Sequence, residues 1–512
     1  MTISETGQPA AWRAPKGFLW IYVALMISML LGALDQTIVS TALPTVVGEL
    51  NSVSKMSWVV TAYTLAATIG MPIYGKFGDV LGRKWLFVGA LVIFLAGSTL
   101  CGLSQSIGQL IAFRAVQGLG GAGLMVLSQA IIADVVPARE RARYMAPLGA
   151  VFGLASVVGP LLGGLLTDYA HWRWIFWINL PLGAVAIVAS VLLLKDTVVT
   201  HAKLTVDWLG IAAMAIAVSG LTLIVGLAGT RLSWTSPGIL ALGALTVAAA
   251  IAFIIVETRA RDPIIPMHLF RSRIFTIATG LGILAALGMF SAVAYVPTYL
   301  QMVFGINATI SGYMLIPMVA AITITGIVSG ALISRRGHYR IFPIIGMATM
   351  GLALYLLSTM SAGQPVWIVP AYLAVLGAGL GCVLQVLVLI VQNDADPAEV
   401  GTATSANNFF REIGATMGVT VVGGLFANRL GQSLGTLDLP SGDRALSTME
   451  AITPALLQDL PTELRSEVIA AYAGSLTPIY AYLVPVFALA LIIAFFLPEK
   501  ALAESNSPAE QQ

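Results

Sequence analysis

The stretch GKFGDVLGRK, residues 75–84, lies between two apolar segments and decides how the whole chain is interpreted. Its glycines lack a Cβ atom and therefore permit a tight turn with positive φ. They are Gly75, Gly78 and Gly82. We expect Asp79 near the start of the next helix, where the helix dipole favours a carboxylate. Arg83 and Lys84 favour a cytoplasmic position, because basic residues gather in cytoplasmic loops. The stretch thus predicts a short cytoplasmic turn between two membrane helices.

The composition predicts a membrane protein without metal or nucleic-acid chemistry. Of the 512 residues, 58% are apolar and only 10% are charged, whereas soluble proteins carry about 25% charged residues. The formal net charge of +2 does not indicate a nucleic-acid partner. The four histidines show no metal-ligand spacing, and the two cysteines lie in apolar segments. We therefore expect no metal site, no cofactor and no disulfide framework.

Apolar runs of about 20 residues are long enough to cross a bilayer as helices, and unpaired backbone groups in hydrocarbon exclude other structures. We identify about fourteen such runs, which predict an all-α integral membrane protein. They are 18–43, 56–75, 84–104, 108–133, 144–167, 173–194, 207–228, 235–256, 275–301, 310–334, 341–359, 366–391, 402–427 and 474–497.

Basic residues predict which side of the membrane each loop faces. Arg and Lys follow the second, fourth, sixth, eighth and tenth runs, whereas the short loops between these positions carry few charges. Cytoplasmic loops carry an excess of Arg and Lys, so these loops and both termini are expected in the cytoplasm. Residues 428–472 then form an extracellular loop. Its amphipathic segment 456–469 predicts a helical hairpin with Thr462 as an N-cap; a disordered linker is the alternative.

An internal repeat divides the chain into two similar halves. The glycine spacing of 75–84 recurs at Gly330 and Gly337, and DVVPA at 134–138 resembles DADPA at 394–398. Parallel repeats of six spans are a recurring transporter plan, with the substrate site near the bilayer midplane between the units. We expect a cytoplasmic tail at 1–17, a six-helix bundle at 18–200, two inserted helices at 201–260, a second six-helix bundle at 261–500 and a cytoplasmic tail at 501–512.

Five further stretches are similar to the motifs of one transporter family. They are LDQTIVSTALP at 34–44, RAVQGLGGAG at 114–123, GPLLGG at 159–164, WRWIFWINLP at 172–181 and DWLG at 207–210. With the turn at 75–84, they make the chain resemble the fourteen-span drug:proton antiporters of the major facilitator superfamily, the QacA/EmrB type. This resemblance extends over nearly the whole chain.

The resemblance implies a major facilitator fold with two six-helix bundles and two extra central helices. It further implies a monomer in the plasma membrane of a bacterium that exports lipophilic, cationic drugs by alternating access, driven by the proton gradient. The protein would not be an enzyme, and its partners would be a small-molecule substrate, protons and the bilayer. Two alternatives stay open: export of an endogenous metabolite, lipid or antibiotic on the same fold, and proton-independent facilitation.

Ionisable residues inside membrane spans are expensive and are candidates for function. About four lie well inside the predicted spans: Asp35, Arg114, Arg411 and Glu412. Asp35 and Arg114 lie at similar depths, so we expect them to meet in the first bundle. Desolvation raises the pKa of such a carboxylate and a nearby cation lowers it, which suits reversible proton binding. We predict Asp35 as the coupling acid and Glu412 as a second proton or cation site, with structural ion pairs as the alternative.

Charged and small residues at and within the spans predict moving parts. Asp79, Arg83 and Asp134, with the glycines of the turn, are predicted to form a cytoplasmic latch that holds the outward-open state. The second copy of the turn has Ser334 in place of the acid. Small residues permit close helix contact and proline bends a helix, so the fifth span is predicted as a hinge, with plain packing as the alternative. Its motif residues are Gly153, Gly159, Pro160, Gly163 and Gly164.

Aromatic faces attract lipophilic cations, so aromatic residues in the spans are predicted to line the substrate cavity. With Gln117 in the fourth span, these candidates are Tyr63, Phe290, Tyr295, Tyr299 and Tyr313. Packing between helices is the alternative for Tyr295 and Tyr299, which share a helix face. The chain shows no nucleophile–base set and no phosphate-binding loop, which disfavours an enzyme. Its internal repeat disfavours an oligomeric channel.

Overall fold

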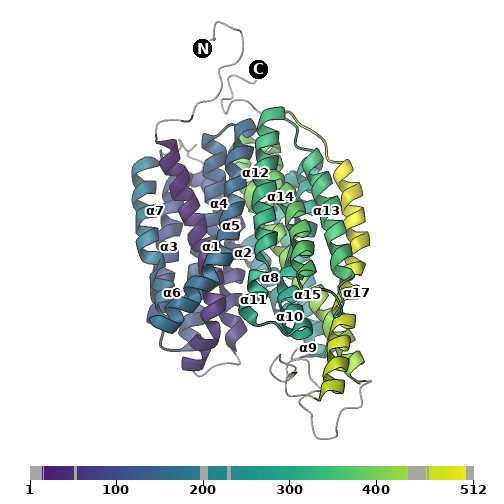
Figure 1. Ribbon diagram of the computed structural model, residues 1–512. Coiled ribbons are helices and arrows are strands. Elements are labelled where there is room, and N and C mark those ends of the chain that lie inside the picture. The colour runs from purple at the N-terminus through teal and green to yellow at the C-terminus, as the bar shows by residue number, and fades with distance from the viewer. Residues whose placement is uncertain are drawn as a thin grey trace.

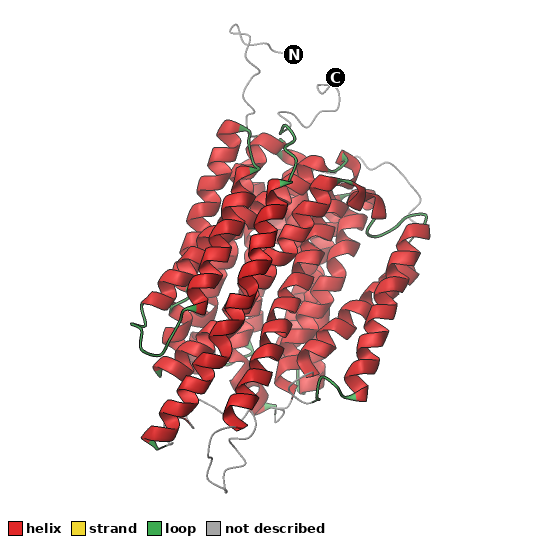
Figure 2. Ribbon diagram, turned by 90° about the vertical axis from the view of Figure 1, so that its right-hand side faces the viewer, coloured by secondary structure: helices red, strands yellow, loops and turns green. Residues whose placement is uncertain are grey.

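The computed structural model is all-helical and describes residues 14, 17–50, 55–195, 206–227, 232–435, 457 and 461–502. Within these ranges it has 14 helical segments that are long and apolar enough to cross a membrane, and it has no β-strand. The long helices run side by side (Figure 1), and Figure 2 shows the same arrangement from a second side. The prediction of an all-α membrane protein with about fourteen spans is confirmed.

The first bundle contains α1 to α7. Its helices are α1 (Phe18–Glu49), α2 (Met56–Leu81), α3 (Arg83–Leu103), α4 (Ile107–Val135), α5 (Ala138–Tyr169), α6 (Trp174–Trp177) and α7 (Asn179–Leu193). The two inserted helices are α8 (Trp208–Leu227) and α9 (Pro237–Arg259).

A short 3₁₀ helix, η2 (Met267–Arg271), leads into the second bundle. The helices of this bundle are α10 (Arg273–Phe304), α11 (Ala308–Tyr313), α12 (Ile316–Arg336), α13 (Ile341–Ser358), α14 (Ile368–Asp394), the 3₁₀ helix η3 (Pro397–Glu399), α15 (Val400–Gly435) and α17 (Thr462–Phe495).

Helix α1 begins and helix α17 ends on the same face of the molecule (Figure 1). We call it the basic face, because helix ends there carry a group of arginines. These are Arg83, Arg139, Arg141, Arg335 and Arg336.

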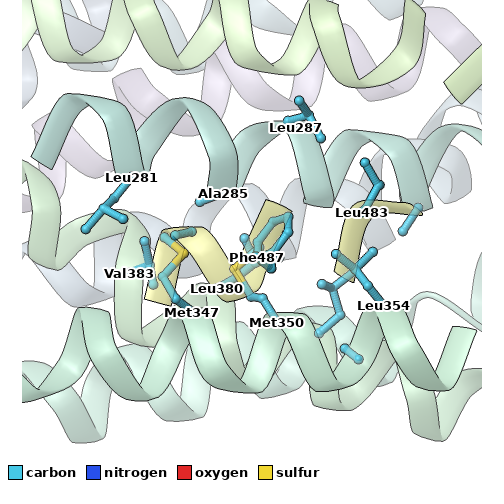
Figure 3. Packing of buried hydrophobic residues seen from close by; sticks show 14 of the residues in the cluster. Leu281, Ala285, Leu287, Met347, Met350, Leu354, Leu380, Val383, Leu483 and Phe487 are labelled. Atoms are coloured by element: carbon cyan, nitrogen blue, oxygen red, sulfur yellow. The ribbon is translucent and has the colours of Figure 1, made fainter. Parts of the chain in front are cut away.

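Each bundle has a hydrophobic core of its own. Two clusters of buried apolar side chains fill the first bundle, and a larger cluster fills the second and extends to the inserted helices and to Ala138 and Ala142 of α5. Figure 3 shows part of the second core, where Phe487 of α17 lies near Met350 of α13 and Leu287 of α10. Because most of each core lies within one bundle, a bundle can keep most of its internal packing when the contact between bundles changes.

Close helix contacts inside the bundles depend on glycine. A Cβ on Gly120 of α4 would lie 2.4 Å from the backbone nitrogen of Phe94 of α3, and a Cβ on Gly414 of α15 would lie 2.3 Å from the carbonyl oxygen of Ile283 of α10. In lipid, helix association depends on such close packing, because lipid chains are as apolar as the side chains.

The inserted helices contact both bundles. Helix α8 packs against α9, against α2 of the first bundle and against α15 of the second. A Cβ on Gly220 of α8 would lie 2.2 Å from Oγ1 of Thr246 of α9, so these two helices form a tight pair. The pair therefore lies across the boundary between the two halves on one side of the molecule.

Several helix ends differ from the predicted spans. Helix α5 begins at Ala138, directly after Pro137, so Arg139, Arg141 and Arg143 belong to its first turns and not to a loop. Two predicted spans are interrupted, between α6 and α7 and between α11 and α12. Hydropathy alone does not show these features, because the charged first turns and the breaks leave the apolar run unchanged.

The predicted extracellular loop at 428–472 is shorter in the structure. Helix α15 continues to Gly435, and α17 already begins at Thr462. The segment predicted to belong to a separate helical hairpin is therefore, from Thr462 onward, the first part of α17. The N-cap is Pro461 and Thr462 is the first helical residue, so the N-cap prediction is wrong. Residues 436–456 and 458–460 lie outside the described residues.

Candidate functional site

Asp35 and Arg114 form a buried ion pair inside the first bundle. Helix α1 carries Asp35, α4 carries Arg114, and Nη1 of Arg114 donates to Oδ2 of Asp35. The Arg114 side chain is 1% exposed and that of Asp35 is 0% exposed. Removing one partner from a buried pair leaves an uncompensated charge and costs roughly 3–5 kcal/mol. Each residue therefore depends on the other for its place in the bundle.

Further polar side chains complete the network around Asp35. Gln117 donates to Oδ1 of Asp35 at 2.7 Å, and Asn179 donates to the same atom at 3.2 Å. Arg114 also donates to Oε1 of Gln117 at 2.8 Å, and Asn179 donates to Oγ of Ser98 at 3.0 Å. Gln117, Asn179 and Ser98 are all fully buried. The network joins α1, α3, α4 and α7 and gives the Asp35 carboxylate three donors.

Sequence reasoning missed Asn179 and Ser98. Asn179 belongs to the motif at 172–181, so its place in that motif was the available signal. Ser98 gives no signal, because a serine in an apolar helix commonly bonds its own backbone. In the structure Ser98 instead donates to the carbonyl oxygen of Phe176 at 2.7 Å, where α6 lies against α3.

Tyr63 connects this network to a small cavity. The guanidinium carbon of Arg114 lies 4.3 Å from the centre of the Tyr63 ring. Tyr63 and Gln36 also line a cavity of about 30 Å³ between α1, α2 and α4. Gln36 is exposed in the middle of α1. Asp35, in its closed network, is therefore followed directly in the sequence by a residue on the exposed face of α1.

Arg411 and Glu412 differ from the buried pair. Both lie in α15 and both are partly exposed. The structure shows no hydrogen bond or ion pair of either side chain with another described residue. Glu412 lies 12 positions after Val400, about 18 Å along the helix at 1.5 Å per residue. It is therefore an acid at the depth of the bilayer interior, and the adjacent Arg411 attracts its carboxylate.

The aromatic candidates occupy different places. Tyr299 is fully buried in the core of the second bundle, and Tyr295 donates to the carbonyl oxygen of Val419 at 2.7 Å. Phe290 is half-buried, and Tyr313 is 50% exposed near the end of α11. Of the predicted cavity residues, Tyr63 lines the small cavity between α1, α2 and α4. In this state Tyr295 and Tyr299 pack between helices, which was the alternative for both.

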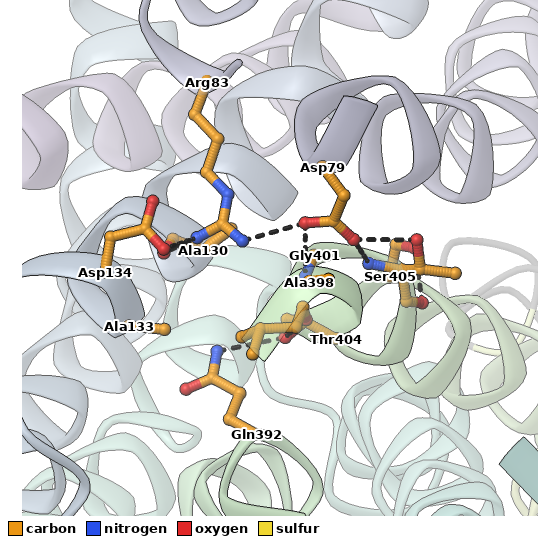
Figure 4. A network of polar contacts seen from close by, with 12 residues as sticks. Asp79, Arg83, Ala130, Ala133, Asp134, Gln392, Ala398, Gly401, Thr404 and Ser405 are labelled. Atoms are coloured by element: carbon orange, nitrogen blue, oxygen red, sulfur yellow. Dashed lines mark hydrogen bonds and ion pairs between the residues drawn. The ribbon is translucent and has the colours of Figure 1, made fainter. Parts of the chain in front are cut away.

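The expected position of Asp79 near the start of the third span is wrong, because α2 continues to Leu81. Asp79 lies in the last turn of α2, and its carboxylate meets the N-terminus of α15 from the other bundle (Figure 4). It accepts from the N–H groups of Gly401 and Thr402 at 2.9 and 2.6 Å, and from Oγ1 of Thr402 at 2.8 Å. The helix dipole still favours the carboxylate, but the dipole belongs to α15.

Arg83 joins the two acids of the predicted latch. Its Nη2 lies 2.8 Å from Oδ1 of Asp79, and its Nη1 lies 2.5 Å from Oδ1 of Asp134 at the end of α4. Figure 4 shows Arg83 between the two carboxylates, with Asp79 facing Gly401. The structure thus brings Asp79, Arg83 and Asp134 together, and it adds the N-terminus of α15, which the sequence did not indicate.

The second copy of the turn makes a complementary contact. Arg139, in the first turn of α5, donates to the carbonyl oxygens of Ser334 and Arg335 at 3.2 and 3.5 Å, at the end of α12. One contact between bundles therefore sets a carboxylate on a helix N-terminus, and the other sets a guanidinium on a helix C-terminus.

Amide side chains form a third contact between the bundles near the basic face. Gln392 of α14 donates to the carbonyl oxygen of Gln129 at 3.3 Å, and Asn408 of α15 donates to Oε1 of Gln129 at 2.7 Å. Arg141 donates to Oε1 of Gln392 at 3.4 Å. These bonds and those of Asp79 and Arg139 close the boundary between the bundles on the basic face.

On the opposite face, a comparable polar cluster stays within the first bundle. Glu49, at the end of α1, accepts from Arg173 at 3.0 Å and from Nε1 of Trp172 at 2.7 Å. Burial acts to raise the pKa of Glu49, but the hydrogen bonds from Arg173 and Trp172 outweigh it and hold the pKa below its usual value. The cluster links α1 to the α5–α6 connection and contributes nothing to closure between bundles.

The glycines of the turn have two different roles. Gly82 has a φ of +88° and ends α2, and Gly337 has a φ of +77° and ends α12, so both repeat positions require left-handed backbone. Gly75 is helical and serves contact between the bundles: a Cβ there would lie 1.9 Å from Oγ of Ser405 in α15. Gly78 is likewise helical and packs near Leu127.

We expect Gly75→Ala to open the contact on the basic face and to reduce transport roughly tenfold. The added Cβ would also lie 2.7 Å from the carbonyl oxygen of Gly401, so α2 and α15 must separate. Gly89→Ala is the matched control, because a Cβ on Gly89 meets nothing within 4 Å. Transport rates and membrane levels of both variants check this; equal transport by the two would contradict it.

The motif of the fifth span packs against two helices. A Cβ on Gly159 would lie 2.0 Å from Oγ1 of Thr37 in α1, and a Cβ on Gly163 would lie 2.9 Å from the carbonyl oxygen of Ile38. Gly153 instead faces α12, where a Cβ would lie 2.3 Å from Cγ1 of Val319. Helix α5 thus has glycine contacts on both sides of the boundary.

The other two motif residues, Pro160 and Gly164, do not serve close packing between helices. Helix α5 continues through Pro160, which is exposed, and a Cβ on Gly164 would meet nothing within 4 Å. The packing role is thus visible for Gly153, Gly159 and Gly163, and the hinge role of the motif stays a prediction.

Comparison with known proteins decides the family. The family model described as Major Facilitator Superfamily matches residues 25–419. The chain belongs to the major facilitator superfamily. It is 41% identical over 493 residues to an uncharacterized MFS-type transporter of Mycobacterium tuberculosis, covering 96% of this chain and 71% of that protein. It is 38% identical to the multidrug transporter protein MdtP of Bacillus subtilis, covering 81% of this chain and 76% of MdtP.

Solved structures support the fold of this major facilitator protein. The human organic anion transporter MFSD10 superposes with a TM-score of 0.62 at 14% identity, covering 94% of this chain and all of that one. The relatives of this chain are transporters and not enzymes, so this chain is a membrane transporter of small molecules.

Proposed function

We propose that this protein exports lipophilic, cationic drugs or toxic compounds from a bacterial cell in exchange for protons. It would lie in the plasma membrane with the basic face and both termini in the cytoplasm. The name and similarity of the multidrug relative support the substrate class. The arginines on the basic face support the orientation.

The single observation that carries this proposal furthest is the contrast between two acids. Asp35 accepts three hydrogen bonds and is fully buried, whereas Glu412 is partly exposed and makes no hydrogen bond or ion pair with another described residue. A transporter that exchanges a cation for a proton needs an acid that can meet the substrate and an acid whose protonation follows the state of the protein. Glu412 fits the first requirement, and Asp35 with Arg114 fits the second.

The contacts on the basic face support alternating access. Asp79, Arg139 and Gln392 all bond across the boundary there, so this state is closed toward the proposed cytoplasm. Transport would require these bonds to break while the separate cores of the bundles stay intact. We propose that protonation of Asp35 weakens its pairing with Arg114, allows α1 and α4 to shift, and so favours the opposite state.

Efflux in inverted membrane vesicles tests the function. A fluorescent lipophilic cation should accumulate inside such vesicles when an inward-acid pH gradient is imposed, and an ionophore that dissipates the gradient should abolish the accumulation. Vesicles without the protein control for passive uptake. Accumulation that survives the ionophore would support proton-independent facilitation instead, and accumulation of uncharged or anionic compounds alone would support a metabolite exporter.

A further inference from the structure

Two carboxyl groups meet where the inserted helices α8 and α9 reach the basic face, outside both bundles. Asp207 directly precedes α8, and Glu257 lies near the end of α9 and is only 2% exposed. Oδ1 of Asp207 accepts from the N–H of Gly210 at 2.8 Å, and Oε2 of Glu257 accepts from the N–H of Ile265 at 3.1 Å. A backbone amide thus fixes one oxygen of each carboxyl group.

The second oxygen of each group is buried and has no hydrogen-bond partner in the described part of the chain. Both oxygens point to the same place: a Cβ on Gly210 would lie 2.6 Å from Oδ2 of Asp207 and 2.8 Å from Oε1 of Glu257. Glycine at this position leaves the space between them open. Two carboxylates in one such site repel when both are ionised, and pairs of this kind share one proton.

We propose that Asp207 and Glu257 hold one exchangeable proton between Oδ2 and Oε1, as a hydrogen bond from a carboxylic acid to a carboxylate. The proton comes from water at the basic face. An O–H bond forms on one of the two oxygens, and the other oxygen accepts it. The site lies in neither bundle and is separate from Asp35 and Glu412, so it goes beyond the proposed coupling.

The surroundings connect this proton site to the turn at 75–84. The side chains that act electrostatically on Glu257 are Asp207, which directly precedes the facing helix α8, and Lys76, on α2. Helix α8 packs directly against α2. Loss of the proton adds a negative charge that attracts Lys76 more strongly. Proton binding at the inserted helices therefore changes the electrostatic setting of the helix that carries Asp79.

Infrared spectroscopy of the full-length protein in lipid nanodiscs, without substrate, tests the proposal. At neutral pH the wild type should show a C=O stretching band of a protonated carboxyl group that both Glu257→Gln and Asp207→Asn remove. Each variant keeps an oxygen for its backbone N–H donor, so folding is expected to persist. Glu399→Gln is the control: this acid on the same face pairs with His268 at 2.8 Å, and its replacement should leave the band unchanged.

Two outcomes would overturn the shared proton. A band that persists in Asp207→Asn would show that Glu257 is not protonated by sharing, and a band removed from the wild type by sodium at constant ionic strength would show a cation site.

The melting temperature gives an independent measure. As the pH rises, the melting temperature of the wild type should fall relative to that of Glu257→Gln, because the repulsion between Asp207 and Glu257 grows. Melting temperatures of the two proteins that change in parallel with pH would contradict the proposal. Neither measurement depends on transport, so failure of the drug-export proposal leaves both interpretable.

Discussion

Asp35→Asn is expected to abolish proton-driven efflux. The amide keeps the shape of the carboxyl group and still accepts hydrogen bonds from Gln117 or Asn179, but it cannot hold an exchangeable proton. We expect at least roughly a tenfold loss of gradient-driven transport, equivalent to about 1.4 kcal/mol. Substrate-induced proton release from energised vesicles, compared between wild type and variant, measures it.

A second variant separates loss of coupling from loss of structure. Asp35→Asn leaves the guanidinium of Arg114 buried without its counter-ion, which by itself lowers stability. The double variant Asp35→Asn with Arg114→Gln removes that charge, so its melting temperature should recover while coupling stays absent. Glu412→Gln should weaken efflux less, or only for cationic substrates. Full proton-coupled efflux by Asp35→Asn would place the coupling site elsewhere, with Glu412 as the next candidate.

Asp79→Asn is expected to slow transport while substrate binding stays near normal. The carboxylate accepts three hydrogen bonds from the start of α15 and pairs with Arg83, and a hydrogen bond to a charged group contributes about 1.5–3 kcal/mol. Loss of the charge should therefore disfavour the state closed on the basic face by roughly 10- to 140-fold. Transport rates in reconstituted vesicles, together with equilibrium substrate binding, check this.

A neighbouring variant controls for general damage at this contact. Thr402→Val removes the hydroxyl donor to Asp79 but keeps both backbone N–H donors, so its effect should be smaller. Impaired binding with an intact transport cycle in Asp79→Asn would show that the residue serves the substrate and not the closure of the bundles.

The spans could be predicted from the sequence, but their ends could not. Hydropathy identifies a helix only where lipid surrounds it. The first turns of α5 are helical because Pro137 starts the helix, and α17 starts in the same way after Pro461. Both segments are amphipathic or charged, so they resemble loops in the sequence even though they continue into a span.

The part of the candidate site that lies inside the spans could be predicted, because charged residues are rare there. Asp35 and Arg114 stand out because few charges lie inside the spans, and equal depth in neighbouring helices suggested their contact. The contact of Asp79 with α15 was not predictable, since its partners lie 322 and 323 positions away and present backbone N–H groups. Asp207 and Glu257 were missed for a different reason: each lies at a helix end, where charged residues are ordinary.

The attachment of α8 and α9 determines which surfaces must slide during a rocking motion. Glu257 accepts from the N–H of Ile265 in the segment that leads into α10, and α9 contacts η2. The inserted pair is thus tethered to the second bundle. Its contact with the first bundle, by contrast, is the side-by-side packing of α8 on α2. If the two bundles rock against each other, α8 and α9 would therefore move together with the second bundle. The surfaces that slide past each other would then be those of α8 and α2.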